Sequence, residues 1–96
     1  FHEIINLSPS VSDEKNYDVV GPVCETGDFL GKDRTISAEE DNILAVLDVG
    51  AYGMSMSSNY NSRPKVAEIL IDEGKAHLIR NRESFADLIH GEKLLP

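Results

Sequence analysis

A cysteine followed directly by a glutamate is the pair of side chains in this sequence most suited to chemistry. Cys24 and Glu25 lie in the segment 21–28, which contains two glycines and a proline. Such a segment is unlike an ordinary strand or helix of a hydrophobic core. A neighbouring carboxylate disfavours the thiolate, which argues against a thiolate nucleophile. The pair is compatible with a neutral thiol that donates a proton to a carbanion, and with a glutamate that binds an ammonium group. The alternative is inert packing, the commoner role of a single cysteine.

A second candidate is the loop Gly50-Ala-Tyr-Gly53, which follows an apolar strand and precedes a possible helix. Phosphates bind at such places, but the loop lacks the third glycine of a dinucleotide loop and the lysine of a P-loop. It is therefore a weak signal by itself. The histidines have no pairwise ligand spacing, so no metal site is predicted. They are His2, His77 and His90.

Short strands must position these loops. Runs rich in apolar and β-branched residues predict strands, bounded by glycine and proline. The expected strands cover residues 2–7, 17–20 and 43–49, with 29–36 as a possible edge strand. Residues 66–71 and 75–80 flank Asp72-Glu73-Gly74, which predicts a β-hairpin with glycine in its turn.

Helix is expected in two short segments. Tyr52, Met56 and Tyr60 recur every four residues, which predicts a short helix over Met54–Asn61. Ser84 can cap a final helix that ends before Gly91. Residues 37–40 resemble a capping box but precede the next strand too closely, so a single turn is expected there. Five or six short strands with little helix predict a mainly β fold, a small antiparallel barrel or sandwich with a short C-terminal helix.

Composition excludes several classes of protein. The 96 residues include 9 basic and 17 acidic side chains, for a net charge of −8, which disfavours nucleic acid and anionic membrane surfaces as partners. No apolar run is long enough to cross a bilayer, and a single cysteine cannot form an internal disulfide. The whole imbalance lies before Val49, where 11 acids face 3 bases. Solvated loops explain it most simply; a carboxylate site for an amine substrate is the sharper alternative.

The length suggests one small domain that would be marginally stable alone. The sequence starts at Phe1 rather than methionine, and its first residues read as the middle of an element. Two interpretations follow, a small monomer with a trimmed tag or a piece of something larger.

Two long strings resemble the C-terminal region of the diaminopimelate decarboxylases. They are Tyr17-Asp-Val-Val-Gly-Pro-Val-Cys-Glu-Thr-Gly-Asp-Phe-Leu-Gly-Lys-Asp-Arg34 and Gly50-Ala-Tyr-Gly-Met-Ser-Met-Ser-Ser-Asn-Tyr-Asn-Ser-Arg-Pro64. The hairpin and the Phe85-Ala-Asp-Leu-Ile helix also fit, so that the resemblance runs from Phe1 to about Ile89. The pairing of Cys-Glu-Thr-Gly-Asp with Gly-Ala-Tyr-Gly is its most specific part.

The resemblance implies that residues 1–96 are the C-terminal β-domain of a longer, pyridoxal phosphate-dependent carboxy-lyase of fold type III. Such enzymes bind the cofactor in an N-terminal (β/α)8 barrel, which this chain lacks. They form head-to-tail homodimers, with each active site between one barrel and the partner's C-terminal domain. The reaction implied converts meso-2,6-diaminopimelate to L-lysine and CO2 in lysine biosynthesis, in the cytoplasm. A related decarboxylase of another diamino acid or carboxylated polyamine, and a non-catalytic β-domain for assembly, are the alternatives.

The resemblance also implies residue roles. Cys24 matches the catalytic cysteine that gives a proton to the carbanion left by loss of CO2. Glu25 matches a residue that contacts the substrate's amino group, and Tyr52 one whose hydroxyl reaches both the cofactor phosphate and the substrate. Four further polar residues in the matched strings are expected to support the loops: Asp28, Ser58, Asn59 and Asn61.

The lysine that holds the cofactor, the glycine-rich phosphate loop and the substrate-binding arginines of the family belong upstream of Phe1. None of the lysines here is expected to replace that lysine, because all lie in polar segments: Lys15, Lys32, Lys65, Lys75 and Lys93. The isolated chain is therefore expected neither to bind the cofactor tightly nor to decarboxylate.

Overall fold

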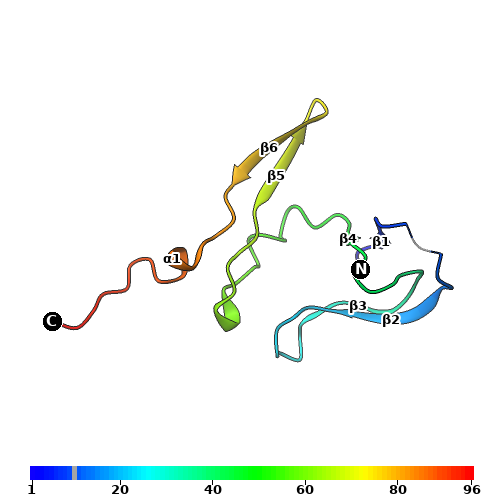
Figure 1. The fold of residues 1–96 in the computed structure, drawn as a ribbon, viewed down its shortest axis with the longest axis horizontal. Helices are drawn as coiled ribbons and strands as arrows, with labels where there is room; N and C mark the ends of the chain where they lie inside the picture. The colour runs from blue at the N-terminus through cyan, green and yellow to red at the C-terminus, as the bar shows by residue number, and fades with distance from the viewer. Residues whose placement is uncertain (10) are drawn as a thin grey trace. The chain divides into compact units, whose positions relative to one another are not determined.

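The computed structural model describes residues 1–9 and 11–96 and divides the chain into two compact units. The first unit is Phe1–Tyr52 and the second is Gly53–Pro96. Figure 1 traces both along the chain. Each unit is described by itself below.

Two antiparallel strand pairs build the first unit. Strand β1 (Ile4–Asn6) pairs with β4 (Leu44–Val46), and β2 (Lys15–Val20) pairs with β3 (Phe29–Ile36) (Figure 1). The register of β2 and β3 shifts on both sides of Val19, which marks bulges in the last residues before the Cys24 loop.

The core of this unit is small. Ile4 and Ile36 are each 8% exposed, and β1 lies against β3. Gly31 is buried on β3, where a Cβ atom would come within 2.8 Å of Ile4 Cδ1. The glycine thus allows the close approach of β1 to β3. Asn6 secures the same region, because its amide nitrogen donates to the Ser37 carbonyl at 2.9 Å.

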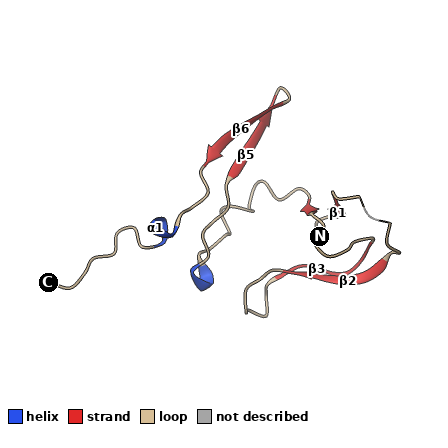
Figure 2. Cartoon of the chain, in the orientation of Figure 1, coloured by secondary structure: helices blue, strands red, loops and turns tan. Residues whose placement is uncertain are grey.

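The second unit consists of a hairpin between two short helical turns, the 3-10 turn η1 (Tyr60–Ser62) and helix α1 (Phe85–Leu88) (Figure 2). Strands β5 (Glu68–Asp72) and β6 (Lys75–Arg80) pair antiparallel, as the sequence predicted. The turn residues Glu73 and Gly74 have φ of 49° and 75°. Two consecutive positive φ angles are what a two-residue type I′ hairpin turn requires.

The fold is mainly β, as predicted, but the described strands form three separate two-stranded sheets rather than a closed barrel. The strands predicted over residues 2–7 and 43–49 are present but shorter, as β1 and β4 respectively. Pairing still continues past them, since Leu7 N–H donates to Ile43 O and Leu47 N–H to Glu3 O, both at 2.8 Å. The final helix is one turn long, and the cap predicted at Ser84 is present as a capping box with Asp87.

The helix predicted over Met54–Asn61 is wrong. Residues 51–56 form turns instead, and the only helical turn nearby is η1. Ser57 explains the difference, because its hydroxyl and its N–H both bond the Met54 carbonyl, at 2.5 and 3.0 Å. Such side-chain bonds compete with helix continuation. The positive φ angles of Asn61 and Ser62 then turn the chain away.

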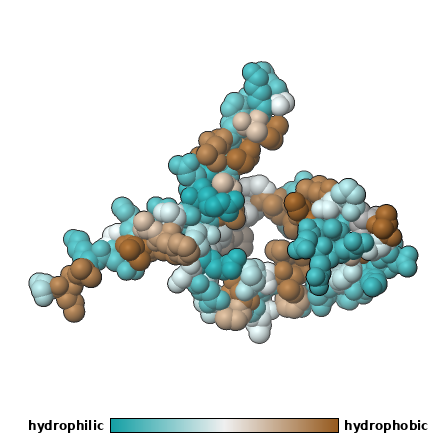
Figure 3. Space-filling view, in the orientation of Figure 1, coloured by the Kyte–Doolittle hydropathy of each residue, from teal (hydrophilic) through white to brown (hydrophobic). Residues whose placement is uncertain are grey.

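Large apolar side chains remain exposed in both units, among them Ile71 (65%) and Tyr52 (71%). Figure 3 shows apolar surface along the β5–β6 hairpin. The chain exposes 8270 Å², whereas two separate compact bodies of half its size would together expose about 6,600 Å². The excess, about 1,700 Å², is the size of a standard protein interface. Among the described residues, no helix is long and apolar enough to span a membrane.

Candidate active-site loops

Backbone hydrogen bonds close the loop that carries Cys24. The loop leaves β2 at Gly21 and enters β3 at Phe29. Gly21 N–H donates to Asp28 O at 3.0 Å, Asp28 N–H to Glu25 O at 3.1 Å, and Phe29 N–H to Gly27 O at 2.8 Å. The first bond joins the two ends of the loop, and the other two form turns near its tip. The loop is therefore ordered by its own backbone.

Asp28 fastens the inside of this loop. Its Oδ2 accepts the Val23 N–H at 2.8 Å, one residue before the cysteine. A Cβ atom on Gly21 would lie 2.2 to 2.5 Å from the Asp28 carboxyl group, so only glycine leaves room for the carboxylate. The expectation that Asp28 supports the loop is therefore confirmed.

The two candidate side chains at the tip are exposed. Cys24 is an exposed thiol outside any disulfide, and the Glu25 carboxylate accepts Gly27 N–H at 2.7 Å. The Thr26 hydroxyl donates to the other carboxylate oxygen at 3.4 Å, so both bonds turn Glu25 back over its own loop and fix the carboxylate. The loop thus carries a thiol and a fixed carboxylate at consecutive positions of its exposed tip.

Tyr52 lies in a different segment of the same unit. Its N–H donates to the Val49 carbonyl at 3.3 Å, in a turn that follows β4, and the residue is 71% exposed. The neighbouring Gly50 has open space around it. An exposed phenol beside an unobstructed turn can donate a hydrogen bond to a phosphate or carboxylate.

A third segment, residues 59–65, is fastened by Glu83, a residue that sequence reasoning did not assign. Glu83 Oε1 accepts the Asn59 amide at 2.7 Å and the Lys65 N–H at 2.6 Å, and Glu83 N–H donates to Lys65 O at 3.0 Å. The Lys65 N–H, followed by the Asn59 amide, lowers the pKa of Glu83 below its ordinary value of 4.5. We call these three bonds of Glu83 the Glu83 clasp. In the sequence, Glu83 is only a carboxylate shortly after the hairpin, and nothing there distinguishes it from a solvent-exposed surface carboxylate.

The supporting roles expected of Ser58 and Asn59 are also confirmed. Ser58 Oγ accepts the Tyr60 N–H at 3.3 Å, and Asn59 donates to Arg63 O at 3.0 Å as well as to Glu83. Asn61 has φ of 60° in η1. These residues shape the chain of the second unit before β5 and do not form a group of reactive side chains.

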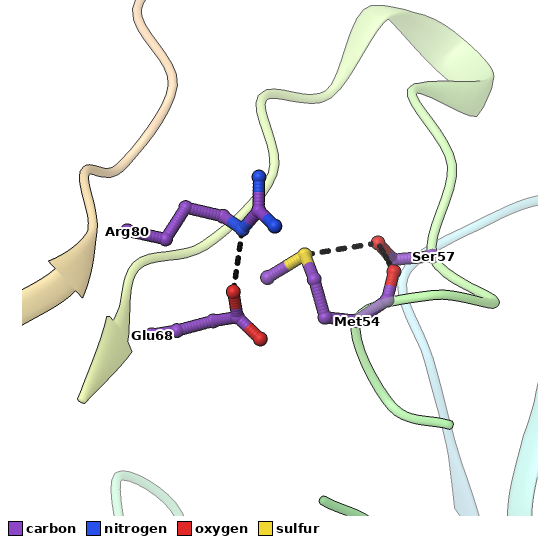
Figure 4. A network of polar contacts seen from close by, with 4 residues as sticks. All are labelled: Met54, Ser57, Glu68 and Arg80. Carbon is purple, nitrogen blue, oxygen red and sulfur yellow. Dashed lines mark hydrogen bonds and ion pairs between the residues drawn. The ribbon is translucent and has the colours of Figure 1, made fainter. Parts of the chain in front are cut away.

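The base of the hairpin is closed by an ion pair in which Arg80 Nε donates to Glu68 Oε2. Figure 4 shows the Met54 side chain beside this pair, with Ser57 bonded to it. Met54, Lys65, Arg80 and Glu83 line a hollow of about 300 Å³ within the second unit. Arg80 is paired with Glu68, and Glu83 accepts from the Lys65 N–H and the Asn59 amide, which is typical of groups that stabilise the local structure.

Among the described residues, no group of three or more histidine, cysteine, aspartate or glutamate side chains is placed to hold a metal ion. The first unit carries all 11 acids of the acidic half against 3 bases, so its field favours cationic ligands and partners.

Comparison with known families gives one matching family model. Residues 1–50 match the C-terminal sheet domain of pyridoxal-dependent decarboxylases. The match covers the whole Cys24 loop and ends just before Tyr52.

Individual proteins extend the match to the rest of the chain. The diaminopimelate decarboxylase of Vibrio cholerae is 51% identical over 96 residues, which are 100% of this chain and 23% of that protein. The crystal structure of the M. jannaschii enzyme superposes with a TM-score of 0.90 at 38% identity, over 100% of this chain and 22% of that one. The Helicobacter pylori enzyme complexed with L-lysine gives 0.83 at 43% identity, over 93% and 22%. The chain thus spans about a quarter of the length of these relatives.

Proposed function

This chain belongs to the pyridoxal-dependent decarboxylase family, and from that membership we propose that it is the C-terminal part of an enzyme converting meso-2,6-diaminopimelate to L-lysine and CO2. The observation that carries the proposal is the 51% identity to a diaminopimelate decarboxylase over all 96 residues. Solved relatives complexed with L-lysine, the product of that reaction, support it further. The ordered Cys24 loop and the exposed Tyr52 are consistent with it.

In this proposal Cys24 is the proton donor. Bound pyridoxal phosphate supplies an electron sink for the electron pair that loss of CO2 leaves on the α-carbon. The Cys24 thiol then delivers its proton to that carbon, which takes the place of the lost carboxyl group. The resulting thiolate regains a proton from solvent. The exposed position of Cys24 at a loop tip gives a ligand access to Sγ.

Glu25 and Tyr52 are the proposed binding residues. The Glu25 carboxylate, already fixed by the Gly27 N–H, would accept hydrogen bonds from the substrate ammonium group. The Tyr52 hydroxyl would donate to the cofactor phosphate and reach the substrate. Both contacts would orient the substrate. They would raise the rate by holding its α-carbon within reach of the Cys24 thiol.

The cofactor fits this chain at one contact only. Tyr52 offers a phosphate donor, but its turn is open and does not enclose a ligand. Four of the lysines are exposed, and Lys65 is half-buried with its N–H held by Glu83. We propose that the rest of the polypeptide, an N-terminal barrel, holds the cofactor, and that the active enzyme is a cytoplasmic homodimer in which this domain completes the partner's site.

The test is an assay of the full-length protein with added pyridoxal phosphate. We expect L-lysine and CO2 to form in equal amounts from meso-2,6-diaminopimelate. Other diamino acids and a carboxylated polyamine, tested in parallel, should react at least about a hundredfold more slowly, since a missing polar partner in the site is costly. Faster turnover of one of them would reassign the substrate, and turnover of none would leave the β-domain without a catalytic role.

A further inference from the structure

The chain that follows Tyr52 is folded back on itself by hydrogen bonds of its own residues. The Ser57 hydroxyl and the Ser57 N–H both bond the Met54 carbonyl, at 2.5 and 3.0 Å. The Asn59 amide then donates to the Arg63 carbonyl at 3.0 Å. Each of these bonds joins residues no more than four positions apart, so they give the segment its shape but do not attach it to another element.

The Glu83 clasp attaches this segment to the β5–β6 hairpin. Glu83 lies three residues after the end of β6, and Lys65 lies three residues before the start of β5. The bond from the Glu83 N–H to the Lys65 carbonyl, at 3.0 Å, therefore continues the antiparallel pairing of the two strands. Glu83 Oε1 also accepts the Asn59 amide at 2.7 Å. The clasp thus joins the chain after Tyr52 to the base of an ordered hairpin.

The clasp depends on the negative charge of Glu83. One carboxylate oxygen, Oε1, accepts both the Lys65 N–H at 2.6 Å and the Asn59 amide at 2.7 Å. Hydrogen bonds to an ionised acceptor are shorter and stronger than those between neutral groups. Glu83→Gln keeps nearly the same shape but removes the charge, so it should weaken both bonds without leaving a cavity.

The base of the hairpin also holds the chain two residues beyond Tyr52. Met54 lines a hollow together with Lys65, Arg80 and Glu83. Figure 4 shows the Met54 side chain beside Arg80, with Ser57 bonded to Met54. Two residues of chain span at most about 7 Å. A change in the clasp therefore reaches Tyr52 through a short length of main chain.

We propose that Glu83 is a positioning residue for the cofactor, because its clasp holds the chain after Tyr52 and so keeps the Tyr52 hydroxyl aligned with the phosphate. In this proposal Glu83 contacts neither the cofactor nor the substrate, and acts only through Tyr52. A misaligned hydroxyl binds less well even when it is chemically intact, since a hydrogen bond weakens steeply as its angle departs from linearity. The inference rests on the proposed contact between Tyr52 and the phosphate, but not on which amino acid the enzyme decarboxylates.

A double-mutant cycle on cofactor affinity in the full-length protein tests this inference. The four proteins are the unsubstituted enzyme, Glu83→Gln, Tyr52→Phe and the two substitutions combined. The cofactor's absorbance during dialysis gives the Kd of pyridoxal phosphate for each. We expect Glu83→Gln to raise this Kd about fivefold in the presence of the Tyr52 hydroxyl, and by less than about 1.5-fold once Tyr52→Phe has removed it. Glu73→Gln, in the exposed hairpin turn, is the matched control and should leave the Kd unchanged in both backgrounds.

Asn59→Asp tests the other side of the clasp and leaves Glu83 in place. The substitution is isosteric, but it replaces the donated amide by a carboxylate that repels Glu83. We expect it to raise the Kd of pyridoxal phosphate at least about fivefold, again only while the Tyr52 hydroxyl is present. An unchanged Kd in Asn59→Asp would contradict the clasp as the source of the effect.

The pattern across the cycle decides the inference. A loss of affinity that depends on the Tyr52 hydroxyl supports it. Equal losses in both backgrounds overturn it, because the clasp would then act on the fold as a whole, and no loss in either background overturns it as well. If Tyr52→Phe alone retains the cofactor normally, the phosphate contact fails and the inference fails with it. Affinity is read without turnover, so an enzyme that shows the coupling but forms no L-lysine would refute the proposed reaction alone.

Discussion

At the scale of single residues, the role of Cys24 depends on its accessibility and on the order of its loop. The thiol is exposed at the tip of a turn whose ends are joined by hydrogen bonds. A proton donor that acts after substrate has bound should affect turnover more than binding. This distinguishes Cys24 from a residue that only packs, whose loss would disturb both.

We predict that Cys24→Ala in the full-length enzyme lowers kcat by about a hundredfold, the ordinary contribution of a positioned general acid. KM should change by less than about threefold, since the thiol is used after binding. Steady-state kinetics on the diaminopimelate substrate, with Cys24→Ser as a partial donor control, measures both. An unchanged kcat would remove Cys24 from the mechanism.

Tyr52→Phe removes one hydroxyl and leaves the ring that is 71% exposed here. We predict that the full-length variant binds pyridoxal phosphate about tenfold more weakly, the loss of one hydrogen bond to a charged group. The cofactor's absorbance during dialysis gives its affinity. Tyr60→Phe, on the other side of the unit boundary, is the matched control and should retain the cofactor. Normal retention by Tyr52→Phe would contradict the phosphate contact.

Glu83 makes the fastening of residues 59–65 dependent on pH. Its pKa is lowered because its charged form accepts the Lys65 N–H and the Asn59 amide. A lowered pKa in the folded state means that the clasp is fully formed above the ordinary value of 4.5 and weakens as the pH falls through the lowered one. We predict that the Lys65 amide of the full-length protein exchanges several-fold faster in Glu83→Gln at neutral pH. Glu73→Gln, in the exposed hairpin turn, should leave it unchanged; equal rates in both variants would show that the clasp has no effect.

At the scale of elements, the loop between β2 and β3 depends on the contact between Gly21 and Asp28. Gly21→Ala would place a methyl group 2.2 Å from Asp28 Oδ2 and push the carboxylate off the Val23 N–H. We predict that kcat/KM of the full-length enzyme falls about tenfold, because a shift of the loop by a fraction of an ångström misplaces the thiol. Val11→Ala, at a residue that is 98% exposed in the same unit and outside the candidate loops, is the control and should cost little. Similar losses in both variants would argue against a specific lock.

The elements that the sequence predicted well are those specified by neighbouring residues. The β5–β6 hairpin follows from two apolar runs and a Glu73-Gly74 turn, and the cap of α1 from Ser84 and Asp87. The prediction of a helix over Met54–Asn61 was wrong because it rested on the spacing of apolar residues alone. It took no account of the Ser57 hydroxyl, which bonds the Met54 carbonyl. Glu83 was missed because its partners lie 18 and 24 residues away, a separation that no local pattern encodes.

For the candidate site, too, the sequence indicated only what neighbouring residues specify. Cys24, Glu25 and the support from Asp28 were recognised because they lie within one short string. Their roles toward substrate stay predictions, since they depend on groups outside these residues. The sequence predicted a small antiparallel barrel or sandwich, and strand count alone does not say which strands pair. Here each described strand pairs with only one other.

At the scale of the whole molecule, the three strand pairs leave open edges and exposed apolar faces that this chain does not cover. Isolated two-stranded sheets are at best marginally stable in water. Among the described residues only Ile4 and Ile36 are buried large apolar side chains. So small a core supplies little hydrophobic stabilisation against the conformational entropy that is lost when the chain is ordered.

We therefore predict that the isolated 96-residue chain has no cooperative unfolding transition as a monomer and forms no lysine. Calorimetry and sedimentation measure the first property, and an assay with added pyridoxal phosphate the second. The full-length protein is the positive control and should melt cooperatively. A cooperative transition of the monomeric fragment would contradict the argument from exposed apolar surface, because the fold would then be stable without residues outside this chain. Lysine formation by the fragment would contradict the assignment of the cofactor's lysine to the rest of the polypeptide, so the two outcomes separate stability from chemistry.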